Sequence, residues 1–132
     1  MAEVLDLRFH GYGGLLPATY FDGTGDYLQV ADSPLWDIYE DKTTTYTLEF
    51  WVKFDDHTGD ETMLCQFEDT SNFWQIQHRH GSGLRWYMGS GGAGYAVVGW
   101  AGEIEDSEWH HIMCVKIGGA STATYAMYKD GK

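Results

Sequence analysis

The chain is poor in basic residues, which excludes several large functional classes. Of its 132 residues only 8 are Lys or Arg, against 20 Asp or Glu, so the net charge is −12. Because contacts to phosphate groups depend on Lys and Arg, this balance argues against nucleic acid and against anionic membranes as partners. An acidic surface instead keeps an aromatic protein soluble and supplies oxygen ligands for Ca²⁺.

Cysteine is also scarce, with Cys65 and Cys114 as its only examples. A disulfide scaffold normally has more cysteines in a smaller chain, and neither cysteine has the His/Cys spacing of a zinc site. Both lie in apolar stretches that favour strands. We therefore expect two buried free thiols.

Export, membrane and nucleotide-binding signals are missing as well. Residues 1–8 (MAEVLDLR) lack the basic start and apolar core of a signal peptide, and no apolar run approaches the ~20 residues of a membrane span. No Ser-His-Asp ordering, phosphate-binding glycine loop or paired cysteine motif is present, so nucleophilic and nucleotide chemistry have no support. We expect a chain made in the cytoplasm that reaches any surface by assembly or as part of something larger.

Aromatic residues and glycines are abundant and favour β-structure. Aromatics make up 16% of the chain, with 17 glycines and only 2 prolines, as expected for strands joined by tight turns in a single domain. The strongest strand is predicted at residues 46–54, where Tyr46, Leu48, Phe50, Val52 and Phe54 alternate with polar positions. Shorter strands are predicted at 27–30, 62–67, 73–78, 84–88, 95–100, 109–117 and 124–128, and a helical turn at 34–39.

Three strings in this order carry a family resemblance. They are Phe21-Asp22-Gly23 leading into Tyr27-Leu28-Gln29-Val30, the alternating run 46–54, and Trp109-His110-His111-Ile112. Over roughly residues 19–132 the chain resembles the laminin-G-like branch of the concanavalin-A-like lectin/glucanase superfamily. The resemblance implies an all-β, two-sheet antiparallel jelly-roll sandwich. Glycines ahead of this region predict an N-terminal arm at residues 1–18. Domains of this superfamily mostly hold sugars, calcium or other proteins, and only some branches cut glycosidic bonds.

The C-terminal residues predict a hairpin. A strand at 124–128 runs into Lys129-Asp130-Gly131-Lys132, and Asp-Gly is a strong hairpin signal. Similar proteins continue for several more strands, so the jelly roll is expected to lack its last strands within this sequence. Because a bare sheet edge invites aggregation, we expect residues 124–128 to be paired by a continuation of the chain, another copy or a partner.

A calcium site is the first candidate site. Asp22 and Asp26, with carbonyls near Gly23 or Gly25, have the oxygen-rich, glycine-bent character that Ca²⁺ prefers. The resemblance implies a structural calcium where the first and last strands meet. The alternative is that both Asp side chains only form hydrogen bonds to their own turn. A second acidic loop, from Asp55 to Glu61, is interpreted as a solvated hairpin tip.

A glycan-binding surface is the second candidate. Strand alternation predicts that Trp74, Ile76, Trp86 and Met88 face the core and that Gln75, Gln77, Arg79, Arg85 and Tyr87 face outwards. Sugar rings stack on aromatic side chains, while Arg and Gln hydrogen-bond to hydroxyl or carboxylate groups. The alternative is that the aromatics simply fill the core. His110 and His111 are interpreted as strand residues, one packed and one exposed.

An acidic cluster is the third candidate. Glu103, Glu105 and Glu108 match the spacing of Glu-x-Asp-x-x-Glu in retaining glycosidases of the superfamily, with Glu in place of the central Asp. The favoured alternative is a solvated turn, and no catalytic residues are assigned.

These observations predict a non-catalytic module for binding or assembly. The favoured setting is a bacteriophage virion, as a capsid-decoration or tail-fibre protein with a glycan-binding role and structural calcium as cofactor. The expected partners are other copies of the chain, virion or surface proteins, and glycans. The alternative is a lectin module of a larger secreted microbial surface protein, located at the cell surface. A retaining β-glycosidase is a distant alternative.

Overall fold

The computed structural model describes residues 18–22, 24–38, 42–56, 58–90, 93–99 and 103–132. Contacts divide the chain into two units, Met1–Asp32 and Ser33–Lys132. In the first unit, residues 18–22 and 24–32 form no helix or strand, so the strand predicted at 27–30 is wrong. Four alternating residues are a weak signal, and a strand forms only where a neighbour completes its hydrogen-bond ladder. Of the predicted arm, residues 1–17 lie outside the described residues.

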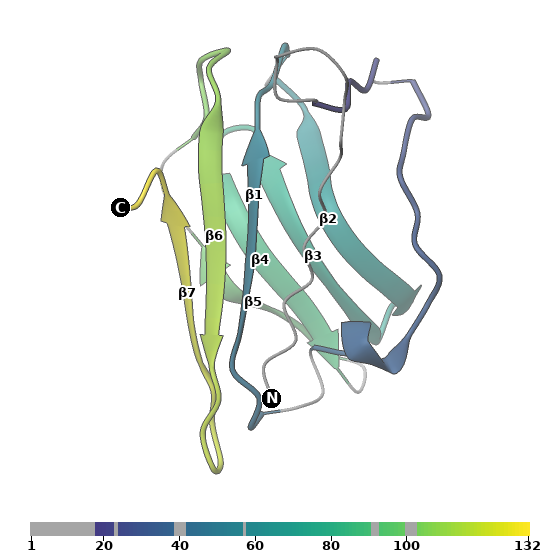
Figure 1. Cartoon of the computed structure of the whole chain (residues 1–132), viewed down its shortest axis with the longest axis vertical. Coiled ribbons are helices and arrows are strands. Elements are labelled where there is room, and N and C mark those ends of the chain that lie inside the picture. The colour runs from purple at the N-terminus through teal and green to yellow at the C-terminus, as the bar shows by residue number, and fades with distance from the viewer. Residues whose placement is uncertain (1–17, 23, 39–41, 57, 91–92, 100–102) are drawn as a thin grey trace. The chain divides into compact units, whose positions relative to one another are not determined.

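The second unit consists of two antiparallel sheets. The elements are η1 (Pro34–Trp36), β1 (Tyr46–Val52), β2 (Asp60–Asp69), β3 (Asn72–Arg79), β4 (Gly83–Ser90), β5 (Ala93–Gly99), β6 (His110–Ile117) and β7 (Thr124–Lys129). One sheet has the order β1-β6-β7 and the other the order β2-β3-β4-β5. Figure 1 shows them as two layers, with the three-stranded sheet in front. The predicted all-β, two-sheet antiparallel architecture is confirmed.

Strand β1 confirms the predicted alternation. Tyr46, Leu48, Phe50 and Val52 are partly buried and pack against the core, whereas the residues between them are exposed. Phe54, just past the end of the strand, is buried. The helical turn predicted at 34–39 is a shorter 3-10 helix, which Ser33 caps by accepting a hydrogen bond from the backbone N–H of Leu35.

The centre of the core is an aromatic contact between the sheets. Trp86 of β4 is fully buried and meets two tyrosines of the other sheet edge-on. Its ring centroid lies 6.1 Å from that of Tyr46 on β1 and 5.3 Å from that of Tyr125 on β7. Edge-to-face pairs of this kind are favourable beyond the area they bury. Trp86 therefore fixes how the two sheets face each other.

An irregularity in β2 changes the position of one cysteine. Thr62 pairs with Gln77 and Leu64 with Ile76, so Met63 is an extra residue between them. Met63 and Leu64 both pack against the core, and Cys65 returns to the outer face, where it is exposed. The expectation of a buried thiol is therefore wrong for Cys65. It is confirmed for Cys114, whose burial raises the pKa of its thiol to about 12.

Two polar side chains cross the interior of the three-stranded sheet. Lys116 is fully buried; its Nζ donates a hydrogen bond to the carbonyl oxygen of Ile38 at 3.3 Å and lies 5.1 Å from the ring centroid of Tyr46. The Tyr46 hydroxyl donates to the same carbonyl at 3.4 Å, and burial raises its pKa. Because a buried ammonium needs partners, these contacts fix residues 38 and 46 beside β6.

Buried Trp74 anchors η1 to the four-stranded sheet. Its Nε1 donates to the carbonyl oxygen of Trp36 at 2.7 Å and contacts Oε1 of Gln66 at 3.1 Å. Gln66 in turn donates from Nε2 to Asp37 at 2.7 Å. The indole N–H is thus satisfied on the inner side of the sheet, which leaves the outer side to other residues.

Among the described residues, no helix has the length and hydrophobicity that a membrane crossing requires.

Candidate functional site

Strands β3 and β4 carry the candidate site on their outer face. Gln75 pairs with Tyr87 and Gln77 pairs with Arg85. Paired residues of antiparallel strands project to the same face, and the residues between them are the buried core residues. The predicted facing is therefore confirmed for these four residues, and Arg79 follows two positions after Gln77 on the same side.

A tight turn holds the two strands in this register. The backbone N–H of Ser82 donates to the carbonyl oxygen of Arg79 at 3.0 Å. Gly81 and Gly83 have φ angles of 72° and 86°, a region that side-chain-bearing residues rarely adopt. The turn brings Arg79 and Arg85, six positions apart in sequence, to neighbouring positions on one face.

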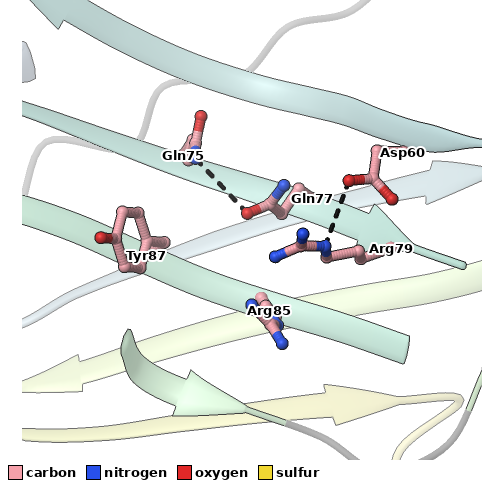
Figure 2. A pocket seen from close by; sticks show the side chains of 6 residues that line it. All are labelled: Asp60, Gln75, Gln77, Arg79, Arg85 and Tyr87. Atoms are coloured by element: carbon pink, nitrogen blue, oxygen red, sulfur yellow. Dashed lines mark hydrogen bonds and ion pairs between the residues drawn. The ribbon is translucent and has the colours of Figure 1, made fainter. Parts of the chain in front are cut away.

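The outer face is hollowed at this point, as Figure 2 shows. The hollow has a volume of about 350 Å³, which lies within the range of small-ligand sites. Its lining residues are Asp60, Gln75, Gln77, Arg79, Arg85 and Tyr87. The structure thus brings together all five residues predicted to bind glycans. Their role in binding stays a prediction.

Asp60 is the lining residue that sequence reasoning missed. The sequence pattern predicts a solvated hairpin tip at Asp60 and Glu61, but they are the first residues of β2. Asp60 forms an ion pair with Arg79, with 3.1 Å between Oδ2 and Nε, and Glu61 points inwards to Nδ1 of buried His78 at 2.8 Å. Thr62 lies on the outer face and pairs with Gln77, so an extension of the strand by two residues would have placed Asp60 on the same face.

The two arginines of the hollow differ in their partners. Arg79 is paired with Asp60, whereas within the described residues no hydrogen bond or ion pair to Arg85 is found. Gln75 donates from Nε2 to Oε1 of Gln77 at 3.4 Å, which leaves the Gln77 amide nitrogen directed away from that contact. The hollow therefore presents a guanidinium group, an amide and a phenol to a ligand.

An aromatic shelf, formed by Phe67, Phe73 and Tyr87, continues the hollow along the sheet. The ring centroid of Phe73 lies 5.6 Å from that of Phe67 and 5.4 Å from that of Tyr87. Phe73 lies over Gly89, where an added Cβ would collide with its ring. Phe67 is 61% exposed, whereas Phe73, which contacts both other rings, is buried at 7% exposure, so Phe67 and Tyr87 are the rings that the shelf offers to a ligand. Sequence reasoning missed both phenylalanines, although Phe73 shares the parity of Gln75 and Gln77.

Two small residues on the neighbouring strands β2 and β5 pair with residues that line the hollow. Gly99 of β5 pairs with Arg85, and a Cβ built there would meet no atom within 4 Å. Open space therefore lies beside the position of Arg85 on the neighbouring strand. Cys65 of β2 pairs with Gln75, which places an exposed thiol in the row that continues to Tyr87.

The predicted calcium ligands form a hydrogen-bonded turn in the first unit. Oδ1 of Asp22 accepts from the backbone N–H of Thr24 at 2.7 Å, and Oδ2 of Asp26 accepts from the backbone N–H of Asp22 at 3.0 Å. This geometry agrees with the alternative interpretation as turn bonds. Two carboxylates fit only part of the six to eight oxygens that Ca²⁺ takes. The described residues contain no group of three or more His, Cys, Asp or Glu arranged for a metal, and calcium stays a prediction.

The acidic cluster at residues 103–108 lies in a turn. These residues form no strand, Ile104 is buried, and Oδ1 of Asp106 accepts from the backbone N–H of Glu108 at 3.0 Å. The glycosidase pattern needs strand alternation to bring its acids to one face. That condition is not met here, in agreement with the interpretation as a turn.

His110, the first residue of the central strand β6, is held between two carboxylates. Its Nδ1 lies 2.9 Å from Asp130 and its Nε2 lies 2.9 Å from Asp106. Burial acts to lower the pKa of His110, but the hydrogen bonds to both carboxylates outweigh it and raise that pKa. The hydrogen bond from His110 lowers the pKa of each aspartate. His110 is thus packed and His111 partly exposed, as predicted.

Asp130 also forms the predicted Asp-Gly turn. Lys129 and Lys132 exchange two backbone hydrogen bonds of 3.0 Å, and Asp130 and Gly131 have φ angles of 52° and 75°. Positive φ at both central residues defines the type I′ turn that joins hairpin strands. Oδ1 of Asp130 accepts from the backbone N–H of His111 at 2.9 Å. The turn is thereby tied to β6. Pairing on the other edge of β7 stays a prediction.

Comparison with known families agrees with this architecture. Residues 22–132 match the laminin-G-type family model described as the Concanavalin A-like lectin/glucanases superfamily. The match covers most of the chain, so the chain belongs to this superfamily, which includes both lectins and glycosidases. Comparison with curated proteins and with solved structures gave no significant match.

Proposed function

We propose that this protein is a non-catalytic carbohydrate-binding module whose binding site is the hollow on β3 and β4. The observation that carries the proposal is the continuity of the aromatic shelf with the polar hollow. Tyr87 belongs to both, because its ring contacts Phe73 and its side chain lines the hollow. Sugars bind to surfaces of this composition, since C–H faces stack on aromatic rings while amides and guanidinium groups bond to hydroxyls.

The described lining residues of the hollow include one carboxylate, which favours a binding role over a catalytic one. Retaining glycosidases need two carboxyl groups about 5–5.5 Å apart. Asp60 is the carboxylate among the lining residues, and it is paired with Arg79. The superfamily's acidic pattern falls at residues 103–108, in a turn. We therefore expect bound oligosaccharide to be released unchanged.

Binding to an array of oligosaccharides, followed by calorimetric titration of the best ligands, tests the proposal. Tyr87→Ala and Gln77→Ala should each weaken binding about tenfold or more, because each removes a contact worth one to two kcal/mol. Trp51→Ala is the matched control: Trp51 is a 64% exposed aromatic on β1 of the other sheet, and its loss should leave binding unchanged.

Two results would contradict the proposal. One is a folded protein that binds none of the oligosaccharides on an array containing neutral, uronic, sialylated and sulfated sugars. The other is binding that Trp51→Ala abolishes and Tyr87→Ala leaves intact. Release of reducing ends during a long incubation would contradict the non-catalytic part alone, and Glu103→Gln and Glu108→Gln would then be the variants to compare.

The setting of this module is a separate part of the proposal. An acidic, aromatic β-domain with few cysteines suits a bacteriophage particle, in which the module would attach the virion to surface glycans. A lectin module in a larger secreted surface protein is the alternative. Sedimentation of the protein with purified particles, detected by mass spectrometry, would support the first, and its recovery from the cell envelope the second.

A further inference from the structure

We infer that the hollow selects acidic sugars, with Arg85 binding the carboxylate or sulfate group. This inference rests on the proposed function and names the ligand class of the same site. Arg85 lines the hollow, and the described residues hold no partner for it. A guanidinium group has five N–H donors in a planar fork, which matches the oxygens of a carboxylate or sulfate.

The charge of the chain makes this arginine unusual. With a net charge of −12, the protein as a whole repels anions. In the hollow, Asp60 neutralises Arg79 at 3.1 Å, and Arg85 adds one further positive charge. A site for neutral sugars would need no such charge. An acidic group on the ligand would be attracted to Arg85, whereas the acidic surface elsewhere would repel it.

The space beside Arg85 suits a bound sugar. Its partner on β5 is Gly99, and an added Cβ there would meet nothing within 4 Å. On its other side Arg85 pairs with Gln77, whose amide lies in the same row. Tyr87 follows two positions along β4 at the start of the aromatic shelf. A sugar ring on Tyr87 would therefore place an acidic substituent beside Arg85, with Gln77 next to it.

Calorimetric titration of the full 132-residue chain with three matched probes tests the inference. The probes are an oligogalacturonate, the same oligomer fully methyl-esterified, and a sulfated galactan oligomer of equal length. We expect one or both acidic probes to bind at least about tenfold more tightly than the ester, as one charge-assisted hydrogen-bond pair implies. The ratio between the two acidic probes identifies the preferred anion.

Two variants assign the preference to Arg85. Arg85→Gln should bring the acidic probes to the affinity of the ester. Lys53→Gln, which removes the same charge at an exposed position after β1, should keep the preference. Gly99→Leu fills the open space and should weaken all three probes, and it provides a second test if Arg85→Gln does not fold. Circular dichroism and thermal unfolding confirm that each variant is folded.

The outcomes separate this inference from the proposed function. If the ester binds as tightly as the acids, or if Arg85→Gln keeps the preference, the site is a glycan site that does not select acidic sugars, and the inference is overturned. If none of the probes binds and the oligosaccharide array is also negative, the proposed function fails and the inference fails with it.

Discussion

Each sheet of the sandwich buries one histidine beside a carboxylate, His78 in the four-stranded sheet and His110 in the three-stranded sheet, but the sheets differ in where they place their other basic side chains. The three-stranded sheet turns Lys116 inwards, where a carbonyl oxygen satisfies it. The four-stranded sheet turns Arg79 and Arg85 outwards into an open hollow. Satisfied buried charges serve the structure, because removing a partner leaves a desolvated group. Outward charges are available to ligands. This difference supports our proposal that the four-stranded sheet carries the binding site.

The largest contrast between the two sheets should lie in thiol reactivity. Cys114, inside the three-stranded sheet, has a thiol pKa raised to about 12, so about one molecule in ten thousand carries the reactive thiolate at pH 8. Exposed Cys65 on the four-stranded sheet should react with iodoacetamide in the native protein while Cys114 does not. Peptide mass spectrometry measures both, with Cys65→Ser as control. Equal labelling of native Cys114 would show that the core opens.

Inner and outer residues of β4 should differ strongly in their effect on stability. Trp86→Ala removes the aromatic contact with Tyr46 and Tyr125 and should lower the free energy of unfolding by about 3–5 kcal/mol. Tyr87→Ala, the next residue on the outer face, should lower it by only about 1–2 kcal/mol, the loss of its ring contact with Phe73. Urea unfolding measures both variants. Equal losses would mean that the facing of β4 is wrong.

The histidine clamp, formed by Asp106, His110 and Asp130, should make stability depend on pH. Because folding raises the pKa of His110 above its ordinary value of 6.5, the histidine stabilises the fold fully below pH 6.5. This stabilisation is lost as the pH rises through the raised pKa. The lowered pKa values of both aspartates stabilise the fold above their ordinary 3.8, and this is lost as pH falls through the lowered values. The clamp should therefore contribute most to the free energy of unfolding between pH 3.8 and pH 6.5.

Thermal unfolding of wild type and His110→Gln across this pH range measures the clamp. The difference in Tm should be largest between pH 3.8 and 6.5 and should shrink above the raised pKa of His110. His111→Gln serves as control, since His111 contacts exposed Glu49 at 3.5 Å and its loss should change Tm little at any pH. A difference for His110→Gln that grows above pH 8 would contradict the assigned protonation.

The smallest expected effect belongs to the ion pair in the hollow. Asp60 and Arg79 are 54% and 48% exposed, and exposed pairs contribute less than about 1 kcal/mol to folding. Asp60→Asn should leave urea unfolding nearly unchanged. Because it releases Arg79 beside Arg85, it should tighten binding of the acidic probes. Weaker binding of those probes in Asp60→Asn would assign Asp60 a direct role in holding the ligand.

The confirmed sequence predictions rest on strand alternation. It placed Trp74, Ile76, Trp86 and Met88 inside and their neighbours outside, because parity within a strand fixes which face each side chain occupies. Alternation failed where a bulge interrupts the strand and where a strand begins earlier than the pattern shows. The extra residue at Met63 turned Cys65 outwards, and the pattern predicts a loop at Asp60. Such events depend on how one strand pairs with its neighbour, which a single strand's pattern does not contain.

Contacts between distant segments were beyond sequence reasoning for a similar reason. His110 was recognised as a packed strand residue, but its contacts with Asp106 and Asp130 join a turn before β6 to the turn after β7. The aromatic shelf likewise combines residues of β2, β3 and β4. These positions converge only once the strands have paired.

Backbone amide chemical shifts during titration with an acidic oligosaccharide test the central claim most directly. The account predicts changes concentrated at Gln75, Gln77, Arg85 and Tyr87, with residues 47–51 of β1 unaffected. Changes concentrated on the outer face of β1 and β6, with the hollow unaffected, would contradict the assignment of the binding sheet.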